Sequence, residues 1–222
     1  TNTLQHYPQM EQEGTFQNRT LPYFRASRVV SRDVLIHSLP ALRDVQYQDR
    51  PALFSRKVRL CCYQFPPQEL LSQNVQHQRD RDLKRATCQE LAQYIHTAKP
   101  NLTDDQLSEI FEMFEINLFQ PLPPSWIDFY DGNIPTDEEN SYIEEHRWDH
   151  LQLIYDIVLK LANLTETDQR FLQKYFSPAF VLGLLERFDS EASRERDYLK
   201  TILHRIYGNF MQLRPFIRTA IN

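Results

Sequence analysis

The stretch of sequence that decides the fold is FDSEASRERDYLKTILHRIYGNFMQLRPFIR, residues 188–218. Apolar residues recur in it at helical spacing, and Ser193 is a suitable N-cap, so a helix is expected from there to about Phe210. Glu195 would lie in the first turn, where the helix dipole favours an anion. The predicted buried face of this helix consists of Leu199, Ile202, Leu203, Ile206, Phe210 and Leu213.

A neighbouring row of the same helix is unusual for a face that only meets water. Spacings of three, four and seven place in this row Lys200, His204, Tyr207, Met211 and, if the helix continues, Arg214. A solvated face would normally carry Glu, Lys and Gln. Two interpretations are open at this point. Either Tyr207 and Met211 widen the core while Lys200 and Arg214 extend to water, or the row is a binding surface.

Composition favours an α-rich globular protein with protein partners. The 222 residues suit one large domain or two small ones, and the 41% hydrophobic and 25% charged shares are ordinary for a soluble chain. Only 4 Gly argue against sandwiches and barrels, which need many tight turns. A formal net charge of -5 gives no reason to expect a nucleic acid as partner.

The cysteines and the hydropathy indicate an intracellular protein without a metal or cofactor. Cys61, Cys62 and Cys88 cannot make a paired disulfide framework and are expected to be reduced packing thiols. A metal site would need a CxxC pair or nearby histidines. We find no apolar run of signal-peptide or membrane-helix length, so no membrane span and a cytoplasmic or nuclear location are expected.

The first part of the chain is predicted to differ from the rest. Residues 1–47 mix Gln, Asn, Arg and Pro with scattered aromatics and show no sustained period, which predicts a flexible N-terminal arm. Within it, short apolar clusters such as residues 28–36 (RVVSRDVLI) are candidates for local docking as a strand or a helical turn.

Residues 48–222 read as a succession of helices. They are expected over 50–63, 80–97, 103–119, from about 146 onward, and over 167–175 and 179–188. Thr103 and Gln106 have the spacing of a capping box, and Ser177 before Pro178 is a second N-cap signal. The helices over 80–97 and 103–119 are separated by only a few turn residues, so we expect them to pair as an antiparallel hairpin.

An acidic, proline-containing segment interrupts this pattern at about 121–145. It holds four prolines, Gly132 and seven acidic residues, a composition that predicts a loop outside the helical array. Two roles are open for it. It is either solvated surface or, through Trp126, Phe129 and Tyr130, a contact for a basic patch on a partner.

The spacing of the helices predicts a repeat architecture. Helices open near Arg81, His146 and Ser193, about 40 to 50 residues apart once the acidic insertion is discounted, which is typical of HEAT or armadillo repeats. We therefore predict an all-α fold, an α-solenoid of HEAT-like helical hairpin repeats. The last helix has no C-cap and no following repeat to cover it, so a solenoid truncated at its C-terminal end is expected.

The sequence gives little support for catalysis. A phosphate-binding glycine loop, a GxSxG elbow and an HExxH motif are all absent. The alternating charges of residues 191–197 are typical of a solvated helix start with local ion pairs. We therefore predict that the chain is not an enzyme.

Longer motifs point to a known family. The run FDSEASRERDYLKTILHRIYGNFMQLRPFIRTAIN, residues 188–222, closely resembles the B-prime family of regulatory subunits of protein phosphatase 2A, with its FDSEDPRERD-like opening, LHRIYG-like core and LR-x-x-IR continuation. WDHLQLIYDIVLKLAN (148–163), MFEINLFQPLPPS (113–125) and FSRKVRLCCYQF (54–65) are similar to other helices of that family. The resemblance runs from about Leu39 to Asn222.

The resemblance implies a function and a site. Members of the family are non-catalytic solenoids that bind the phosphatase scaffold and catalytic subunits and recruit substrates through an L-x-x-I-x-E motif. The motif is received on the concave surface of two successive repeats. The positions that match the first half of this groove are Lys200, Thr201, His204, Arg205, Tyr207 and Arg214.

Two further expectations accompany this assignment. Because the next repeat supplies the other wall of the groove, the chain alone is expected to bind the motif weakly or not at all. The alternative function is that of a generic helical-repeat scaffold, unrelated to phosphatase, that binds another protein through the loop at 121–145.

Overall fold

The computed structural model describes residues 30–35, 38–98, 102–120, 136–163 and 171–222. Within these ranges the chain forms α-helices and short 3-10 helices (η) and no strand, which confirms the predicted all-α class. The elements are η1 (Arg32–Leu35), η2 (Tyr47–Asp49), α1 (Arg50–Cys61), α2 (Pro67–Leu71), α3 (Val75–Ala98), α4 (Asp104–Leu118), α5 (Asp137–Ala162), α7 (Pro178–Glu186), η5 (Arg187–Asp189), α8 (Ser193–Asn209), η6 (Met211–Leu213) and α9 (Arg214–Ile221).

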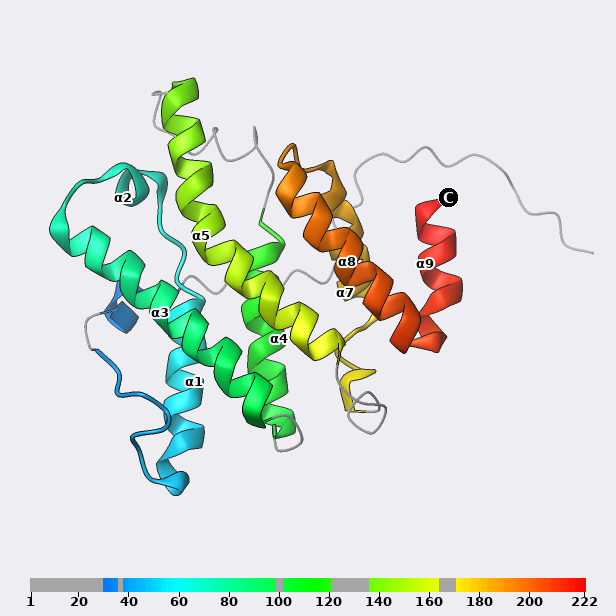
Figure 1. Ribbon diagram of the computed structural model, residues 1–222, viewed down its shortest axis with the longest axis horizontal. Helices are drawn as coiled ribbons and strands as arrows, with labels where there is room; N and C mark the ends of the chain where they lie inside the picture. Colours follow the sequence, from blue (N-terminus) through cyan, green and yellow to red (C-terminus); the bar gives the residue numbers. More distant parts are fainter. Residues whose placement is uncertain (1–29, 36–37, 99–101, 121–135, 164–170) are drawn as a thin grey trace, which may run out of the picture.

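The long helices are stacked in two layers (Figure 1). Helices α3, α5 and α8 lie side by side in one layer, where α5 packs against both of its neighbours. In the other layer α1 packs on α4, and Phe180 of α7 lies against the rings of Phe111 and Phe114 of α4. Helix pairs repeated in two layers form a helical-repeat solenoid, as predicted.

Polar side chains connect the helices of the first layer. Each reaches from one helix to a main-chain carbonyl of the preceding helix. These contacts are His150 Nε2 to Arg81 O (3.0 Å), Lys160 Nζ to Ala92 O (3.3 Å) and Asn209 Nδ2 to Ala162 O (2.7 Å). The earlier contact on α3 (Arg81) meets the earlier one on α5 (His150), and the later contact (Ala92) meets the later one (Lys160). The two helices therefore run parallel, as successive helices of one layer do in a repeat array.

Capping residues place the helix starts. The capping box of Thr103 and Gln106 opens α4, and the Ser177 side chain accepts a hydrogen bond from the main chain of Phe180 at the start of α7, as predicted. A second capping box, formed by Thr136 and Glu139, opens α5 at Asp137. The expected helix start near His146 is therefore wrong, and residues 137–145 of the predicted loop are helical. Residues 121–135, with Trp126, Phe129 and Tyr130, lie outside the described ranges.

Two other local predictions need correction. Ser193 is the first residue of α8 rather than its cap, because the chain enters the helix at Ala192, whose N–H donates to Ser190 Oγ (3.3 Å). The antiparallel hairpin of residues 80–97 and 103–119 does not form. Instead α3 packs mainly on α1 and α5, and α4 packs on the same two helices. The apolar face of each helix selects its neighbour more strongly than the length of the connection does.

The described part of the predicted N-terminal arm is packed against the helices. Leu35 and Leu42 are buried, and Arg32 forms ion pairs with Glu69 (2.6 Å) and Asp80 (2.5 Å). From residue 30 onward, these described residues belong to the helical array. The flexible arm stays a prediction for residues 1–29, which lie outside the described ranges.

A buried carboxylate connects α8 to the preceding helices. Glu195 is 3% exposed, and its Oε1 accepts hydrogen bonds from the Tyr155 hydroxyl of α5 (2.7 Å) and from Nε and Nη2 of Arg187 (3.1 and 2.9 Å). Arg187 also donates through Nη1 to the carbonyl of Gln120, just after α4 (2.9 Å). Burial, reinforced by the charge of Glu195, raises the pKa of Tyr155, so this phenol remains a donor. The cluster therefore joins three helices at the first turn of α8.

Removal of the Glu195 carboxylate should destabilise the protein strongly. Glu195→Ala leaves the guanidinium of Arg187, whose side chain is 12% exposed, without its anion, and the expected loss is about 3–5 kcal/mol of unfolding free energy. Urea denaturation followed by circular dichroism would measure it. Glu191→Ala, at an exposed position in the same segment, is the control and should change stability by less than about 0.5 kcal/mol. Equal losses in the two variants would contradict this role of Glu195.

A second buried group should make stability depend on pH. Burial, with a smaller contribution from the charge of Lys84, lowers the pKa of His150 to about 4. In the unfolded chain the imidazole binds a proton below about pH 6.5. The stabilisation that the folded state gains from a neutral His150 is therefore fully present above about pH 6.5. It is lost as the pH falls towards about 4.

We expect the unfolding free energy to fall by about 2 kcal/mol through His150 between about pH 7 and pH 5. Urea titrations at the two pH values, on the wild type and on His150→Gln, would isolate this term, because Gln does not titrate. An identical pH dependence in both proteins would show that His150 is not responsible.

Candidate functional site

The candidate site lies on α8 and at the start of α9. The residues predicted for the core face of α8 and η6, Leu199, Ile202, Leu203, Ile206, Phe210 and Leu213, are all buried. Of the predicted binding residues, Lys200, Thr201, His204 and Arg205 are exposed, and Tyr207 and Arg214 are half-buried. These six residues, which we call the α8 surface, therefore lie outside the core.

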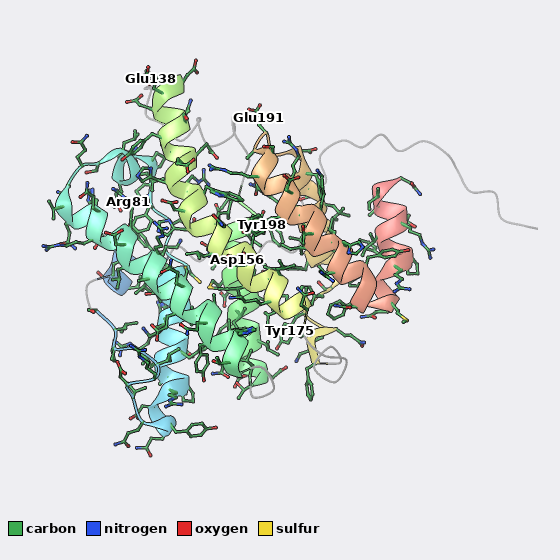
Figure 2. All side chains as sticks on the ribbon, viewed as in Figure 1. Arg81, Glu138, Asp156, Tyr175, Glu191 and Tyr198 are labelled. Carbon is green, nitrogen blue, oxygen red and sulfur yellow. The ribbon has the colours of Figure 1, made fainter. Side chains whose placement is uncertain are left out.

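The α8 surface covers two neighbouring rows of the helix. Lys200, His204 and Tyr207 are three, four and seven residues apart and form one row. Thr201 and Arg205 lie in the row on the side of α5, one turn after Tyr198. The Tyr198 hydroxyl donates to Asp156 Oδ1 of α5 (3.1 Å), at the junction of the two helices (Figure 2). A ligand along α8 would thus have basic and aromatic side chains beneath it and α5 at one edge.

The structure positions Arg214 in an unexpected way. Helix α8 ends at Asn209, so the continuous helix that would have placed Arg214 in the row does not form. The side chain instead folds back over the Tyr207 ring, 5.2 Å from its centroid, and donates to the carbonyls of Tyr207 (2.7 Å) and Gly208 (2.9 Å). These carbonyls belong to the last turn of α8, which has no intrahelical donors for them. Arg214 therefore caps the helix and is held beside Tyr207.

Lys200 has an internal partner that sequence reasoning missed. Its Nζ lies 3.1 Å from Oδ1 of Asp197, and both side chains are largely exposed. Thr201 Oγ1 donates to the main-chain carbonyl of Asp197 (3.0 Å). The spacing of three residues was a usable signal for the ion pair. An acidic ligand at Lys200 would have to compete with this carboxylate.

The charges at the start of α8 are neutralised locally. Arg194 lies over the Trp148 ring at 4.8 Å and pairs with Glu145 of α5 (2.8 Å). The prediction of a solvated helix start with ion pairs therefore holds for the exposed Glu191 and for the paired Arg194, but it is wrong for Glu195, which is buried. The stacking also covers Trp148, which starts one of the motifs singled out in the sequence.

A cavity of about 870 Å³ lies between α2, α5 and the start of α8. Its lining is mixed, with apolar groups from Phe65 and Leu70, the cation of Arg147, and the anions of Glu144 and Asp189. Burial lowers the pKa of Arg147, and the charge of Glu144 partly opposes this. With both signs of charge present, the lining does not select a ligand class, so the α8 surface remains the candidate site.

The described residues do not assemble a metal site. Among them no group of three or more His, Cys, Asp and Glu side chains could hold a metal ion. The same part of the chain contains no helix that is both long and apolar enough to cross a lipid bilayer.

Comparison with known families and proteins gives a consistent result. The family model described as Protein phosphatase 2A regulatory B subunit (B56 family) matches residues 39–222. The matched region coincides with the part of the sequence in which motif resemblance was found.

Individual relatives agree with the family match. The chain is 42% identical over 189 residues to the B' beta isoform of the 57 kDa regulatory subunit of serine/threonine protein phosphatase 2A from Arabidopsis thaliana, covering 84% of this chain and 37% of the relative. It is 39% identical over 198 residues to the delta isoform of the 56 kDa regulatory subunit from Homo sapiens, covering 87% and 31%. The chain thus spans about a third of the length of these relatives. Both are named as regulatory subunits, which agrees with the prediction that this chain is not an enzyme.

Proposed function

The chain belongs to the B56 family of protein phosphatase 2A regulatory B subunits, and from this premise we propose that it acts as a non-catalytic regulatory subunit of a Ser/Thr protein phosphatase. In this role it binds the scaffold and catalytic subunits and recruits substrates that carry an L-x-x-I-x-E motif. The observation that carries the proposal is the coincidence of the family match with an exposed basic and aromatic surface on α8. The site of action is the cytoplasm, the nucleus or both.

The apolar part of the motif is proposed to bind around Tyr207 and His204. Tyr207 is half-buried, and Arg214 covers one face of its ring, so the aromatic edge has a fixed position beside the exposed imidazole. A fully buried Leu or Ile of the ligand would contribute roughly 1.5–3 kcal/mol before ordering costs. A disordered peptide loses conformational freedom on binding. For a complete groove, micromolar affinity, about −8 kcal/mol, is therefore the expectation.

The acidic part of the motif, or phosphates that flank it, is proposed to bind the cations of the α8 surface. Arg214 donates its Nε–H and one N–H of Nη2 in hydrogen bonds to carbonyls of α8. Its other guanidinium N–H groups remain for a carboxylate in a charge-assisted hydrogen bond. Arg205 is exposed in the adjacent row, and Lys200 becomes available when Asp197 is displaced.

A peptide titration tests the site. We expect an L-x-x-I-x-E peptide to shift the amide NMR signals of α8 and the start of α9, with affinity weaker than micromolar because the chain holds only one wall of the groove. Arg205→Glu should weaken binding by about tenfold or more, because it places a carboxylate beside the acidic ligand. Arg59→Glu, at an exposed position on α1, is the matched control and should have no effect.

Two results would contradict this assignment. Shifts confined to other helices would exclude the α8 surface as the binding site. Micromolar binding that depends on the Leu and Ile of the peptide would show that the groove is already complete in this chain.

The assembly proposal has a separate test. We expect the chain to be retained by an immobilised complex of the phosphatase scaffold and catalytic subunits, and more weakly by the scaffold alone. Retention is measured by gel densitometry, with Arg205→Glu as a variant that should still assemble. A chain that folds but is not retained would favour the generic scaffold over the phosphatase subunit.

A further inference from the structure

Two of the three cysteines face each other in the core. The Sγ atoms of Cys61 on α1 and Cys88 on α3 are 3.3 Å apart, and both residues are 0% exposed. Cys62 is oriented differently, because its thiol donates to the carbonyl of Val58 in its own helix (3.3 Å). Neighbouring side chains on a helix diverge by about 100°, so Cys61 and Cys62 cannot both approach Cys88. The tertiary structure thus selects one pair of thiols.

Other contacts hold the two helices together around this pair. Lys57 of α1 forms an ion pair with Glu90 of α3 (2.7 Å), and Glu90 also accepts a hydrogen bond from the N–H of Leu42 (2.6 Å). Lys84, one turn before Cys88, donates to the carbonyl of Tyr63 just after α1 (2.6 Å). The sulfurs would have to approach by only about 1.3 Å to reach the length of a disulfide bond.

We propose that Cys61 and Cys88 are a redox modification site and form a disulfide between α1 and α3 when the protein meets a hydroperoxide. In the first step the thiolate of Cys88 attacks one oxygen of the O–O bond, giving a sulfenic acid and, with hydrogen peroxide, hydroxide that is protonated to water. In the second step the sulfur of Cys61 attacks that of Cys88 and displaces a second water. Two thiols are oxidised to one disulfide, and one peroxide is reduced to two molecules of water.

The surroundings support this assignment of roles. The hydrogen bond with Cys61 lowers the pKa of the Cys88 thiol, and the ammonium of Lys84 acts in the same direction. Burial raises the pKa of Cys61 and brings that of Cys62 to about 12. These contacts favour Cys88 as the first nucleophile and Cys61 as the resolving thiol, and Cys62, whose thiol donates within its own helix, takes no part.

The burial of both sulfurs determines the rate of oxidation. Because neither sulfur reaches solvent, peroxide can enter only when α1 opens from α3, so oxidation is slow and should accelerate in urea below the unfolding transition. The closed core then protects the disulfide from reductants.

The experiment treats the full chain with hydrogen peroxide, alkylates the remaining thiols under denaturing conditions, and maps non-reduced peptides by mass spectrometry. The expected product has lost two alkylatable thiols and contains a Cys61–Cys88 crosslink, with Tm raised by about 5–10 °C. Cys62→Ala is the matched control. It removes one thiol but should form the same crosslink, whereas Cys88→Ala should form none.

The outcomes separate clearly. A Cys61–Cys88 crosslink in the wild type and in Cys62→Ala supports the proposal. Three free thiols after prolonged oxidation, sulfinic acid at Cys88, or a crosslink through Cys62 would overturn it. Circular dichroism shows which variants are folded, and the wild-type peptide map decides the question even if a variant is not.

Discussion

The attachment of α8 to the preceding helices depends on one buried carboxylate. Glu195 is almost completely buried, and its carboxylate accepts hydrogen bonds from the guanidinium of Arg187 and the hydroxyl of Tyr155. A buried anion in the first turn of a helix is stable only with such partners, since desolvation would otherwise cost several kcal/mol. The geometry of this cluster fixes where α8 begins and how it is rotated. The same rotation directs Leu199 and Ile206 into the core and Lys200 and His204 to solvent.

Helix α5 is the element against which the rest of the array is arranged. It packs on α3 and α8 in its own layer and on α4 in the other. Within its layer, successive helices are also joined by a side chain that reaches a carbonyl of the helix before it, such as Asn209 to Ala162. Asn209 satisfies one of the last carbonyls of α5, which have no partner within the helix. Apolar packing supplies the attraction between repeats, and these polar contacts add directional preference.

The α8 surface combines a rigid and an adjustable part. Arg214 and Tyr207 are tied to the end of α8 by two hydrogen bonds and a ring contact, so their positions are set before any ligand arrives. Lys200 and Asp197 are exposed and form an ion pair of the kind that contributes little to stability and can exchange partners. Under the proposed function, the aromatic end would provide shape recognition and the Lys200 end would provide charge selection.

The sequence by itself determined the helical class, the buried face of α8 and the family, because each depends on local periodicity or on contiguous motifs. The capping boxes and the N-cap of α7 are equally local, and the box at Thr136 has the same three-residue spacing to Glu139 as Thr103 has to Gln106. Only the tertiary structure decided that α3 packs on α1, that Arg214 folds back onto Tyr207, and that Cys61 faces Cys88. These contacts join positions from seven to about thirty residues apart, across turns or between layers. Helical periodicity predicts which face of each helix is apolar. It does not predict which other helix that face will pack against, because this depends on contacts between residues far apart in the sequence.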